Sequence, residues 1–405
     1  MEQKYLSDDA FEQIKDFNHE YLTEEQKLLI DKLILNKELK ECYKSYGLCW
    51  ECKQPNTRGG WCNPCNAKRF QQNFKNWTSG NDDIDKFIQN TQLSAKENCK
   101  VLEWIPYDRF YNIEYIAKGG FGKITFHHKL IGGSIIRFYG ITQDPDTKNY
   151  TMVLDYAKNG SLRNHLDKSY NELSWHIKIF YLRDIAYGVN EIHKIGLIHR
   201  DLHIGNILHN NISTYITDMG LCKPADYNAL ENTKKNVYGV LPYIAPEILR
   251  GQNYTKAADI YSFGIIMYET ISGLPPYHDV SHDENLALKI CQGLRPRFNI
   301  KVPQLIVHLT KRCLDTDPLN RPLASEVKDI LYQWYFIFYF QTELQRQIKE
   351  ADKINNKLQT NVPSANLSYE THSEAIYTKN LQIDISQLKI NNNDQNNESE
   401  IREKF

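Results

Sequence analysis

The sequence predicts an α+β fold of two lobes, in which a small β lobe precedes a mainly α-helical lobe. Apolar residues form two short strand-like segments, 134–139 and 150–154, and the turn Asp144-Pro145-Asp146 separates them. After these segments, helical periods of apolar residues dominate the chain. Strands that are followed along the chain by helices are typical of this fold class.

Length and charge exclude several classes of protein. The 405 residues suffice for two or three domains. The 49 basic and 50 acidic residues give a formal net charge of −1, so no overall field attracts nucleic acid or an anionic membrane. No apolar run approaches the roughly 20 residues of a membrane helix, and the first residues contain no apolar signal-peptide core. We therefore expect a cytoplasmic protein that has no membrane partner.

The composition changes along the chain and divides it into five segments. They are an amphipathic helical segment (1–45), a cysteine-containing segment with a short helix (46–110), a globular domain (111–334), an amphipathic helix (335–360) and a disordered tail (361–405). Thr23 and Gln26 have the spacing of a capping box in the first segment. The apolar stripe of 335–360 covers about two heptads, too few for a coiled coil, so we expect this helix to pack against the globular domain.

Four of the nine cysteines are clustered in the second segment. They form two Cys-x-x-Cys pairs, Cys49 with Cys52 and Cys62 with Cys65. In a reducing compartment such pairs are thiols or metal ligands, and this spacing lets four thiolates surround one zinc ion. The sequence therefore predicts a closed, structural zinc knuckle. Basic and aromatic residues surround it, but many small zinc modules share that feature, so we do not favour nucleic acid as a partner.

Five short motifs follow one another in the globular domain. They are Ile198-His199-Arg200-Asp201-Leu202-His203-Ile204-Gly205-Asn206, Asp218-Met219-Gly220, Ala245-Pro246-Glu247, Asp259-Ile260-Tyr261-Ser262-Phe263-Gly264 and Arg321-Pro322. In this order they resemble the pattern of eukaryotic protein kinases. The resemblance implies a bilobal protein-kinase-like fold over 111–334, ATP and Mg²⁺ as cofactors, and a protein substrate or signalling partner. It leaves the oligomeric state open.

The resemblance implies a role for each matching residue. Asp201 occupies the position that meets the incoming hydroxyl, while Asn206 and Asp218 match the two magnesium ligands. Arg200 is placed to pair with a phosphate on the segment between Asp218 and Glu247. Tyr227, Thr233 and Tyr238 are the candidate phosphosites there, and ordinary surface hydroxyls are the alternative.

Other matches concern adenine binding and the framework of the helical lobe. Leu154 resembles the gatekeeper, and Asp155 and Ala157 lie in the hinge whose backbone meets adenine. Glu247 with Arg321 resembles the family's buried ion pair, and Asp259 resembles the carboxylate that braces the catalytic loop. Asn159-Gly160-Ser161-Leu162 and His203-x-Gly205-Asn206 resemble the tyrosine-kinase-like branch, whose members are mostly serine/threonine kinases, although His203 stands where such kinases usually carry lysine.

The nucleotide side of the resemblance is incomplete. Gly119 and Gly122 are kept in the glycine-rich loop, but Ala117 replaces its first glycine. Only residues 123–131 lie between this loop and the segment 132–140, which resembles the family's fourth strand. Two strands and a helix would need roughly 30 residues there. No glutamate occurs from 115 to 170, so the usual lysine–glutamate pair cannot form. We expect little or no turnover, from either a pseudokinase that serves as a scaffold or a kinase whose sequence lacks an internal coding segment.

Overall fold

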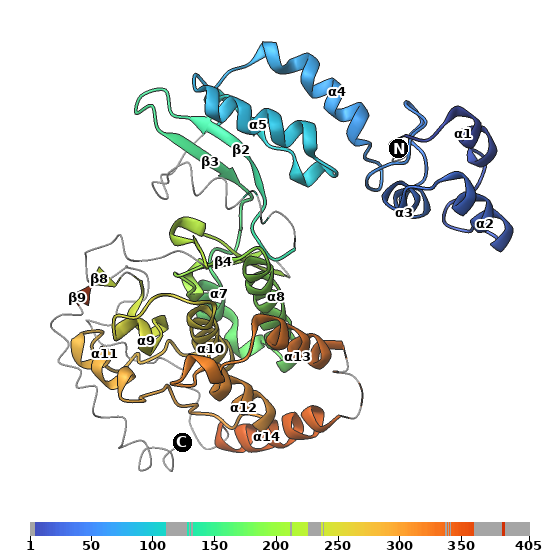
Figure 1. Cartoon of the computed structure of the whole chain (residues 1–405). Coiled ribbons are helices and arrows are strands. Elements are labelled where there is room, and N and C mark those ends of the chain that lie inside the picture. Colours follow the sequence, from blue (N-terminus) through green and yellow to red (C-terminus); the bar gives the residue numbers. More distant parts are fainter. Residues whose placement is uncertain are drawn as a thin grey trace. The chain divides into compact units, whose positions relative to one another are not determined.

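The computed structural model describes residues 5–110, 128, 130, 133–210, 213–225, 236–237, 239–336, 338, 340, 342–359 and 383–384. The chain forms two compact units (Figure 1). The first unit comprises Met1–Ile131 and Arg137–Asp155, and the second comprises Gly132–Ile136 and Tyr156–Phe405. Each unit contains helices and short strands, and helices predominate in the second, so the α+β fold class is confirmed.

Three short helices begin the first unit: α1 (Asp8–Ile14), α2 (Glu24–Leu33) and α3 (Lys37–Tyr46). The capping box before α2 is present, since the Thr23 side chain accepts from the Gln26 backbone N–H and the Gln26 side chain accepts from the Thr23 backbone N–H. The three helices share one apolar core, made of Leu6, Ala10, Ile14, Ile30, Ile34 and Tyr43.

A second core of the first unit lies between a helix and a sheet. The sheet has the order β1-β2-β3, with β1 (Glu103–Trp104) parallel and β3 (Tyr150–Leu154) antiparallel to β2 (Phe138–Gln143). Helix α5 (Asp82–Ser94) contributes apolar side chains to the sheet's core. That core consists of Ile84, Ile88, Leu102, Phe138 and Ile141. Residues 82–104 and the strand-like segments of the predicted globular domain therefore share one apolar core.

One glycine is required where β1 meets β2. A Cβ atom at Gly140 would lie 2.0 Å from the backbone oxygen of Glu103. Any other residue at this position would separate the two strands, so the close parallel pairing depends on glycine. Helix α4 (Asn63–Asn73) and the 3₁₀ turns Phe74–Asn76, Asn98–Lys100 and Tyr107–Arg109 complete the described elements of this unit.

Helices form most of the second unit (Figure 1). They are α7 (Leu162–Ser169), α8 (Trp175–Lys194), α9 (Pro246–Leu249), α10 (Lys256–Ser272), α11 (Glu284–Cys291), α12 (Gln304–Cys313), α13 (Ala324–Phe336) and α14 (Glu343–Gln359). Helix α10 is buried from Ala258 to Ser272 and forms the centre of the unit, since a helix that is apolar on all sides must be surrounded by protein.

Three pairs of short antiparallel strands accompany the helices. They are β4 (Leu197–Ile198) with β7 (Lys223–Pro224), β5 (Ile207–Asn210) with β6 (Ser213–Ile216), and β8 (Asn236–Val237) with β9 (Ile383–Asp384). The 3₁₀ turns of this unit are Tyr170–Glu172, Ile204–Asn206, Met219–Leu221, Leu241–Tyr243 and Pro318–Asn320. Strand β9 lies within the segment that the composition predicts to be a disordered tail.

Helix α14 packs against the body of the second unit. Leu344, Ile348 and Ala351 are buried. The Trp175 indole N–H donates to Asp352 Oδ1 at 2.7 Å, and the Leu305 backbone N–H donates to Gln347 Oε1 at 3.0 Å. The amphipathic stripe therefore forms part of the core of this unit.

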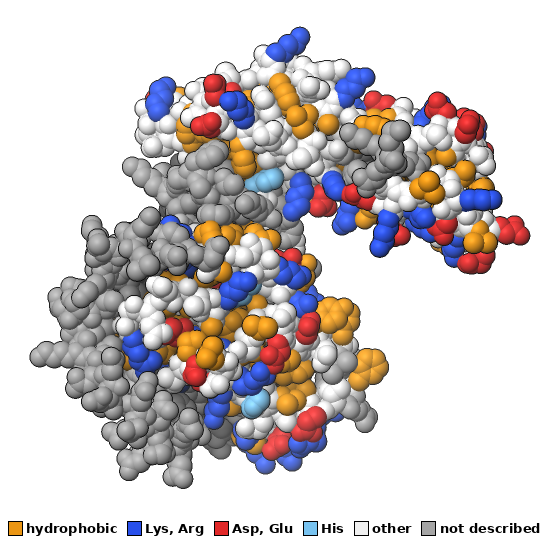
Figure 2. All heavy atoms as spheres, viewed as in Figure 1, with side chains coloured by type: hydrophobic (Ala, Val, Ile, Leu, Met, Phe, Trp, Pro, Cys, Tyr) orange, Lys and Arg blue, Asp and Glu red, His pale blue; other side chains and the backbone are white. Residues whose placement is uncertain are grey.

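Side chains of both charge signs are interspersed over the visible surface of each unit (Figure 2). This distribution agrees with the formal net charge of −1. Within the described residues, no helix combines the length and apolar character that crossing a membrane requires.

Candidate functional site

The loop 199–206 follows β4 in the second unit and is held by the carboxylate of Asp259. The backbone N–H of His199 donates to Asp259 Oδ2 at 2.8 Å, and that of Arg200 donates to Oδ1 at 3.0 Å. His193 on α8 also lies 2.8 Å from Oδ2 through its Nε2. Asp259 on helix α10 thus holds the backbone at the start of the loop, as the resemblance predicts for this carboxylate.

Asp259 is ionised in the folded protein because its partners outweigh its burial. Burial acts to raise the pKa of this carboxyl, but the hydrogen bond and the charge interaction with His193, together with the His199 N–H, hold the pKa below its ordinary value. The bonds to an ionised acceptor are stronger than neutral ones. They maintain Arg200 at φ 70°, a left-handed conformation that is strained for arginine.

Asp201 and Asn206 are joined inside this loop. The Asn206 side-chain Nδ2 donates to the Asp201 backbone oxygen at 2.9 Å, and the Asp201 N–H donates to His199 Nδ1 at 3.3 Å. Because Asn206 uses its amide nitrogen here, its amide oxygen is the atom that can coordinate a cation. This bond fixes the Asn206 side chain relative to the backbone of Asp201.

Two hydrogen bonds bring Asp218 to the same place. The Thr217 N–H donates to the Asn206 backbone oxygen at 2.9 Å, and His199 Nε2 lies 3.1 Å from the Thr217 backbone oxygen. Asp218 itself adopts a left-handed conformation with φ 53°, which aspartate tolerates better than most residues. Its Oδ1 accepts the Gly220 N–H at 3.0 Å, and its side chain is exposed. The structure thus brings the predicted catalytic and magnesium-binding residues together.

His203 occupies the position next to Asp201 where the resemblance leads one to expect lysine. Its Nε2 lies 4.0 Å from Asp201 Oδ1, and its Nδ1 accepts the Gly205 N–H at 3.2 Å. Burial lowers the pKa of this imidazole below its ordinary value, an effect that the nearby Asp201 charge opposes but does not cancel. The ring is therefore neutral at pH 7, and the position supplies a polar group rather than a positive charge.

A cavity of about 10 Å³ lies beside Asp201 and is large enough for about one water molecule. Asp201, His203, Gly239, Val240, Tyr243 and Tyr254 are among the residues that line it. A Cβ atom at Gly239 would lie 3.7 Å from Asp201 Oδ1. The chain that follows β8 therefore reaches the side chain of the candidate catalytic aspartate.

The Arg200 side chain is partly buried and lies over the Tyr254 ring. Its guanidinium lies 4.6 Å from the centre of the Tyr254 ring, and its Nη1 donates to the Leu221 oxygen at 3.5 Å. Its buried Nε has no hydrogen-bond partner among the described residues. Tyr227, Thr233 and Tyr238, the candidate phosphosites, lie outside the described residues, so the predicted role of Arg200 stays a prediction.

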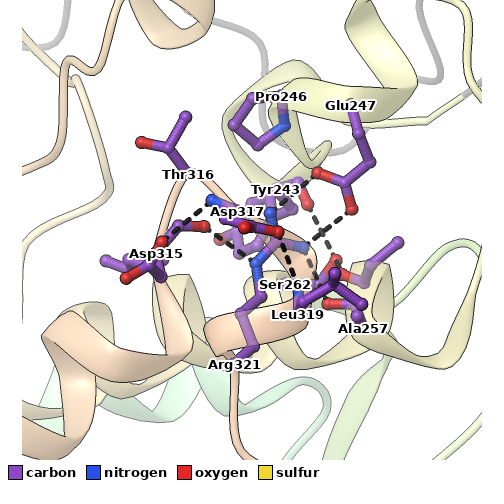
Figure 3. Close-up of polar contacts among 12 residues, drawn as sticks. Tyr243, Pro246, Glu247, Ala257, Ser262, Asp315, Thr316, Asp317, Leu319 and Arg321 are labelled. Carbon is purple, nitrogen blue, oxygen red and sulfur yellow. Dashed lines mark hydrogen bonds and ion pairs between the residues drawn. The ribbon is translucent and has the colours of Figure 1, made fainter. Parts of the chain in front are cut away.

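A buried ion pair between Arg321 and Glu247 joins separate segments of the second unit (Figure 3). Arg321 Nη1 and Nη2 each donate to one oxygen of Glu247 at 2.7 Å. Figure 3 shows that Arg321 also reaches Ala257 and Asp315, and its Nη1 and Nε donate to their backbone oxygens at 2.9 Å. The pair predicted from the resemblance is therefore confirmed, and it links α9 to the first turn of α10 and to the segment between α12 and α13.

The described residues among those predicted to bind the nucleotide belong to different units. Leu154 ends β3 in the first unit, and the Asp155 N–H donates to the Arg137 oxygen at 2.8 Å. Ala157 belongs to the second unit, where its backbone oxygen accepts the Gly160 N–H at 3.0 Å. Gly119 and Gly122 lie outside the described residues. Their assignment to an ATP site remains a prediction.

The four clustered cysteines converge in the first unit. Their Sγ atoms all lie within 4.8 Å of one another. The Cys49–Cys65 and Cys52–Cys62 sulfur distances are 3.8 and 3.4 Å. Four thiolates bound tetrahedrally at about 2.3 Å from one zinc ion lie about 3.8 Å apart, so the donor set and its spacing fit this metal. The predicted convergence of the cysteines is confirmed, while the metal is a proposal.

Sequence reasoning missed the contribution of His193. This residue lies 66 positions before Asp259 in the chain, yet its ring contacts the Asp259 carboxylate. A histidine near the end of an apolar helix has the appearance of an ordinary core or surface residue. No local pattern identifies it, because its role depends on how α8 packs against α10.

Comparisons with known proteins place these features in a family. A family model described as "Protein tyrosine and serine/threonine kinase" matches residues 123–331. This chain belongs to that protein kinase family, and the kinase-like fold predicted for it is confirmed. Curated relatives agree. Three of them, all from Dictyostelium discoideum, are named as probable serine/threonine-protein kinases.

The relatives are longer than the matching part of this chain. One is 28% identical over 236 residues, which cover 55% of this chain and 13% of the relative. Another, roco5, is 32% identical over 224 residues, covering 51% of this chain and 8% of the relative. A third is 28% identical over 255 residues, covering 60% and 48%. The chain thus spans less than half the length of each of these three relatives.

Proposed function

We propose that the second unit carries the catalytic centre of a serine/threonine-directed protein kinase of the tyrosine-kinase-like type. The observation that supports this most directly is the joined arrangement of Asp201, Asn206 and Asp218, which Asp259 holds in place. Phosphoryl transfer depends mainly on positioning and charge neutralisation, and this arrangement offers both. Tyrosine hydroxyls are a further substrate class for the same chemistry.

Each residue has one task in this proposal. Asp201 accepts the proton of the substrate hydroxyl as that oxygen attacks the γ-phosphoryl group. Asn206 and Asp218 would hold magnesium through hard oxygen atoms, and the bound ion would supply positive charge to neutralise the ATP phosphates. The resemblance assigns adenine binding to Leu154, Asp155 and Ala157, and phosphate binding to Gly119 and Gly122. The protein acts in the cytoplasm on a protein substrate or signalling partner.

Turnover of this chain is strongly reduced in the proposal. The lysine that grips the phosphates and its glutamate partner have no counterparts between Gly122 and the strand-like segment 134–139. Alignment of reacting groups is worth at most about 7–11 kcal/mol. A chain that misplaces the phosphates forfeits part of this, which corresponds to several powers of ten in rate.

A kinase assay with purified full-length protein and a generic protein substrate tests the proposal. We expect slow incorporation of phosphate that Asp201→Asn abolishes. The matched control is Asp279→Asn, an exposed aspartate of the second unit to which the proposal gives no role. Turnover at the rate of an ordinary kinase, lost in Asp201→Asn, would disprove the reduced activity. Incorporation that is identical in the wild type and Asp201→Asn would disprove the catalytic assignment.

A non-catalytic scaffold is the second candidate function, and the missing lysine–glutamate pair favours it. Nucleotide-dependent thermal stability separates the two. Stabilisation by millimolar MgATP that is lost in Asp218→Asn supports the kinase, because only a binding-competent site is stabilised by ligand. No shift at any nucleotide concentration supports the scaffold.

We further propose that Cys49, Cys52, Cys62 and Cys65 bind one structural zinc ion as a zinc knuckle. All four coordination positions would come from the protein, so the site is closed and has no open position for a substrate. The ion would hold the start of α4 to the turns that precede it. Zinc would therefore stabilise the first unit without taking part in phosphoryl transfer.

A further inference from the structure

A segment near the C-terminus forms a strand with the loop that leads to the candidate active site. Strand β9 (Ile383–Asp384) pairs antiparallel with β8 (Asn236–Val237), and the two lie side by side in Figure 1. The register places Asn236 opposite Asp384 and Val237 opposite Ile383. The two strands are about 145 residues apart in the chain, so the pairing is a tertiary contact within the second unit.

Strand β8 lies close to the candidate catalytic aspartate. Two residues after Val237 comes Gly239, so their Cα atoms lie within about 7.6 Å of each other. A Cβ atom at Gly239 would be 3.7 Å from Asp201 Oδ1, and Gly239 and Val240 line the cavity beside Asp201. A peptide strand on β8 is therefore bound within two residues of the chain that lines the cavity beside Asp201.

The C-terminal segment starts from a fixed point on the same unit. Helix α14 ends at Gln359 and is held to the body by its buried apolar stripe and by the Asp352–Trp175 hydrogen bond. Residues 360–382 connect it to β9, and at about 3.3 Å each they reach at most roughly 75 Å. A tether of this length keeps the strand at an effective concentration of about millimolar.

We propose that the edge of β8 is a docking site for an extended peptide and that this chain's own Ile383–Asp384 segment occupies it. Strand addition of this kind uses backbone hydrogen bonds and so accepts different side chains. The same edge is thereby withheld from a peptide of another protein. For its consequence in catalysis the inference rests on the proposed function, while the docking itself is independent of activity.

The pairing is suited to displacement. Two opposed residue pairs in an antiparallel ladder include one pair that exchanges both backbone hydrogen bonds. So short a strand gains little from pairing alone and depends on its tether. A second peptide therefore competes with it, and the apparent affinity for that peptide falls by the fraction of β8 that the tail leaves open.

Peptide binding to the full-length chain tests the inference. The probe is a fluorescently labelled synthetic peptide with the sequence of residues 376–390, followed by anisotropy. The variant is Ile383→Pro/Asp384→Pro, because proline removes the backbone donor of whichever pair is hydrogen-bonded. The control is Gln387→Pro, which removes a donor beyond the pair. Hydrogen exchange at the amides of 236 and 237 is measured in all three proteins.

We expect the double-proline variant to bind the probe at least about tenfold more tightly than the wild type and Gln387→Pro, as when the tail fills about 90% of the sites. Faster exchange at Asn236 or Val237 in the double-proline variant should accompany this change. Equal affinity in all three proteins, or binding of a probe that carries the two prolines, would overturn the inference. Both measurements can be interpreted even if the protein has no kinase activity, because neither peptide affinity nor hydrogen exchange depends on turnover.

Discussion

Replacing Arg321 with alanine should destabilise the second unit by about 3–5 kcal/mol, the usual cost of removing one partner of a buried ion pair. Both side chains are almost completely buried, with exposures of 0% for Arg321 and 3% for Glu247. The change leaves the Glu247 carboxylate without its two bonds at 2.7 Å. It also removes the donors to Ala257 and Asp315, so the upper end of this range is expected.

Urea unfolding followed by tryptophan fluorescence measures this loss, and Trp175 in the second unit is a suitable reporter. For a unit of this size, the loss corresponds to a fall of about 6–20 °C in melting temperature. Arg346→Ala is the matched control, because Arg346 pairs with Glu343 at the surface with exposures of 65% and 53%. Exposed pairs of this kind contribute little.

Two further variants sharpen the interpretation. Arg321→Lys keeps the charge but loses the bidentate geometry, so we expect an intermediate loss. Glu247→Leu combined with Arg321→Met removes both charges and should be more stable than Arg321→Ala. If Arg321→Ala unfolds at the same urea concentration as Arg346→Ala, the ion pair is not what holds this part of the fold.

Three other predictions concern pH, metal and the last helix. Burial lowers the pKa of His209 to about 4, below the unfolded value near 6.5, so on acidification the unfolded state takes up a proton before the folded state does. The contribution of His209 to stability should therefore be complete above pH 6.5 and fall by roughly 2–3 kcal/mol towards pH 4. Acid unfolding curves measure this fall, and His209→Gln should flatten it. Metal analysis should find one zinc ion per chain, retained in Cys42→Ser and reduced below half an equivalent in Cys62→Ser; equal zinc in both variants would contradict the site. Asp352→Ala should cost about 1 kcal/mol, seen in urea unfolding, because Trp175 loses its acceptor; an unchanged midpoint would show that α14 is held without it.

Local patterns predicted much of the candidate site in the second unit. Asp201, Asn206 and Asp218 lie in short motifs whose spacing already implies a shared site, and the structure joins them through Asn206 and Thr217. The capping box at Thr23 and the paired cysteines are also local features. Such features are readable because each depends on residues within a few positions of one another.

Contacts between segments that are distant in the chain could not be predicted from the sequence in the same way. The sequence separates residues 46–110 from the globular domain, yet α5 and β1 share a core with β2 and β3. The parallel pairing of β1 with β2 depends on Gly140, which is an unremarkable residue in the sequence. Short apolar segments indicate a strand or helix but not which surface covers it, because several partners satisfy the same pattern.

The sequence by itself determined the family resemblance, the chemistry available at Asp201, Asn206 and Asp218, and the absence of a glutamate from 115 to 170. Only the tertiary structure decided that His193 contacts the Asp259 carboxylate, that His203 is buried as a neutral ring, and that β9 pairs with β8. The physical reason is the separation in the chain between the residues that interact. Residue types and their spacing fix what each segment can do, whereas burial, ionisation and strand partners depend on which distant segment packs against it.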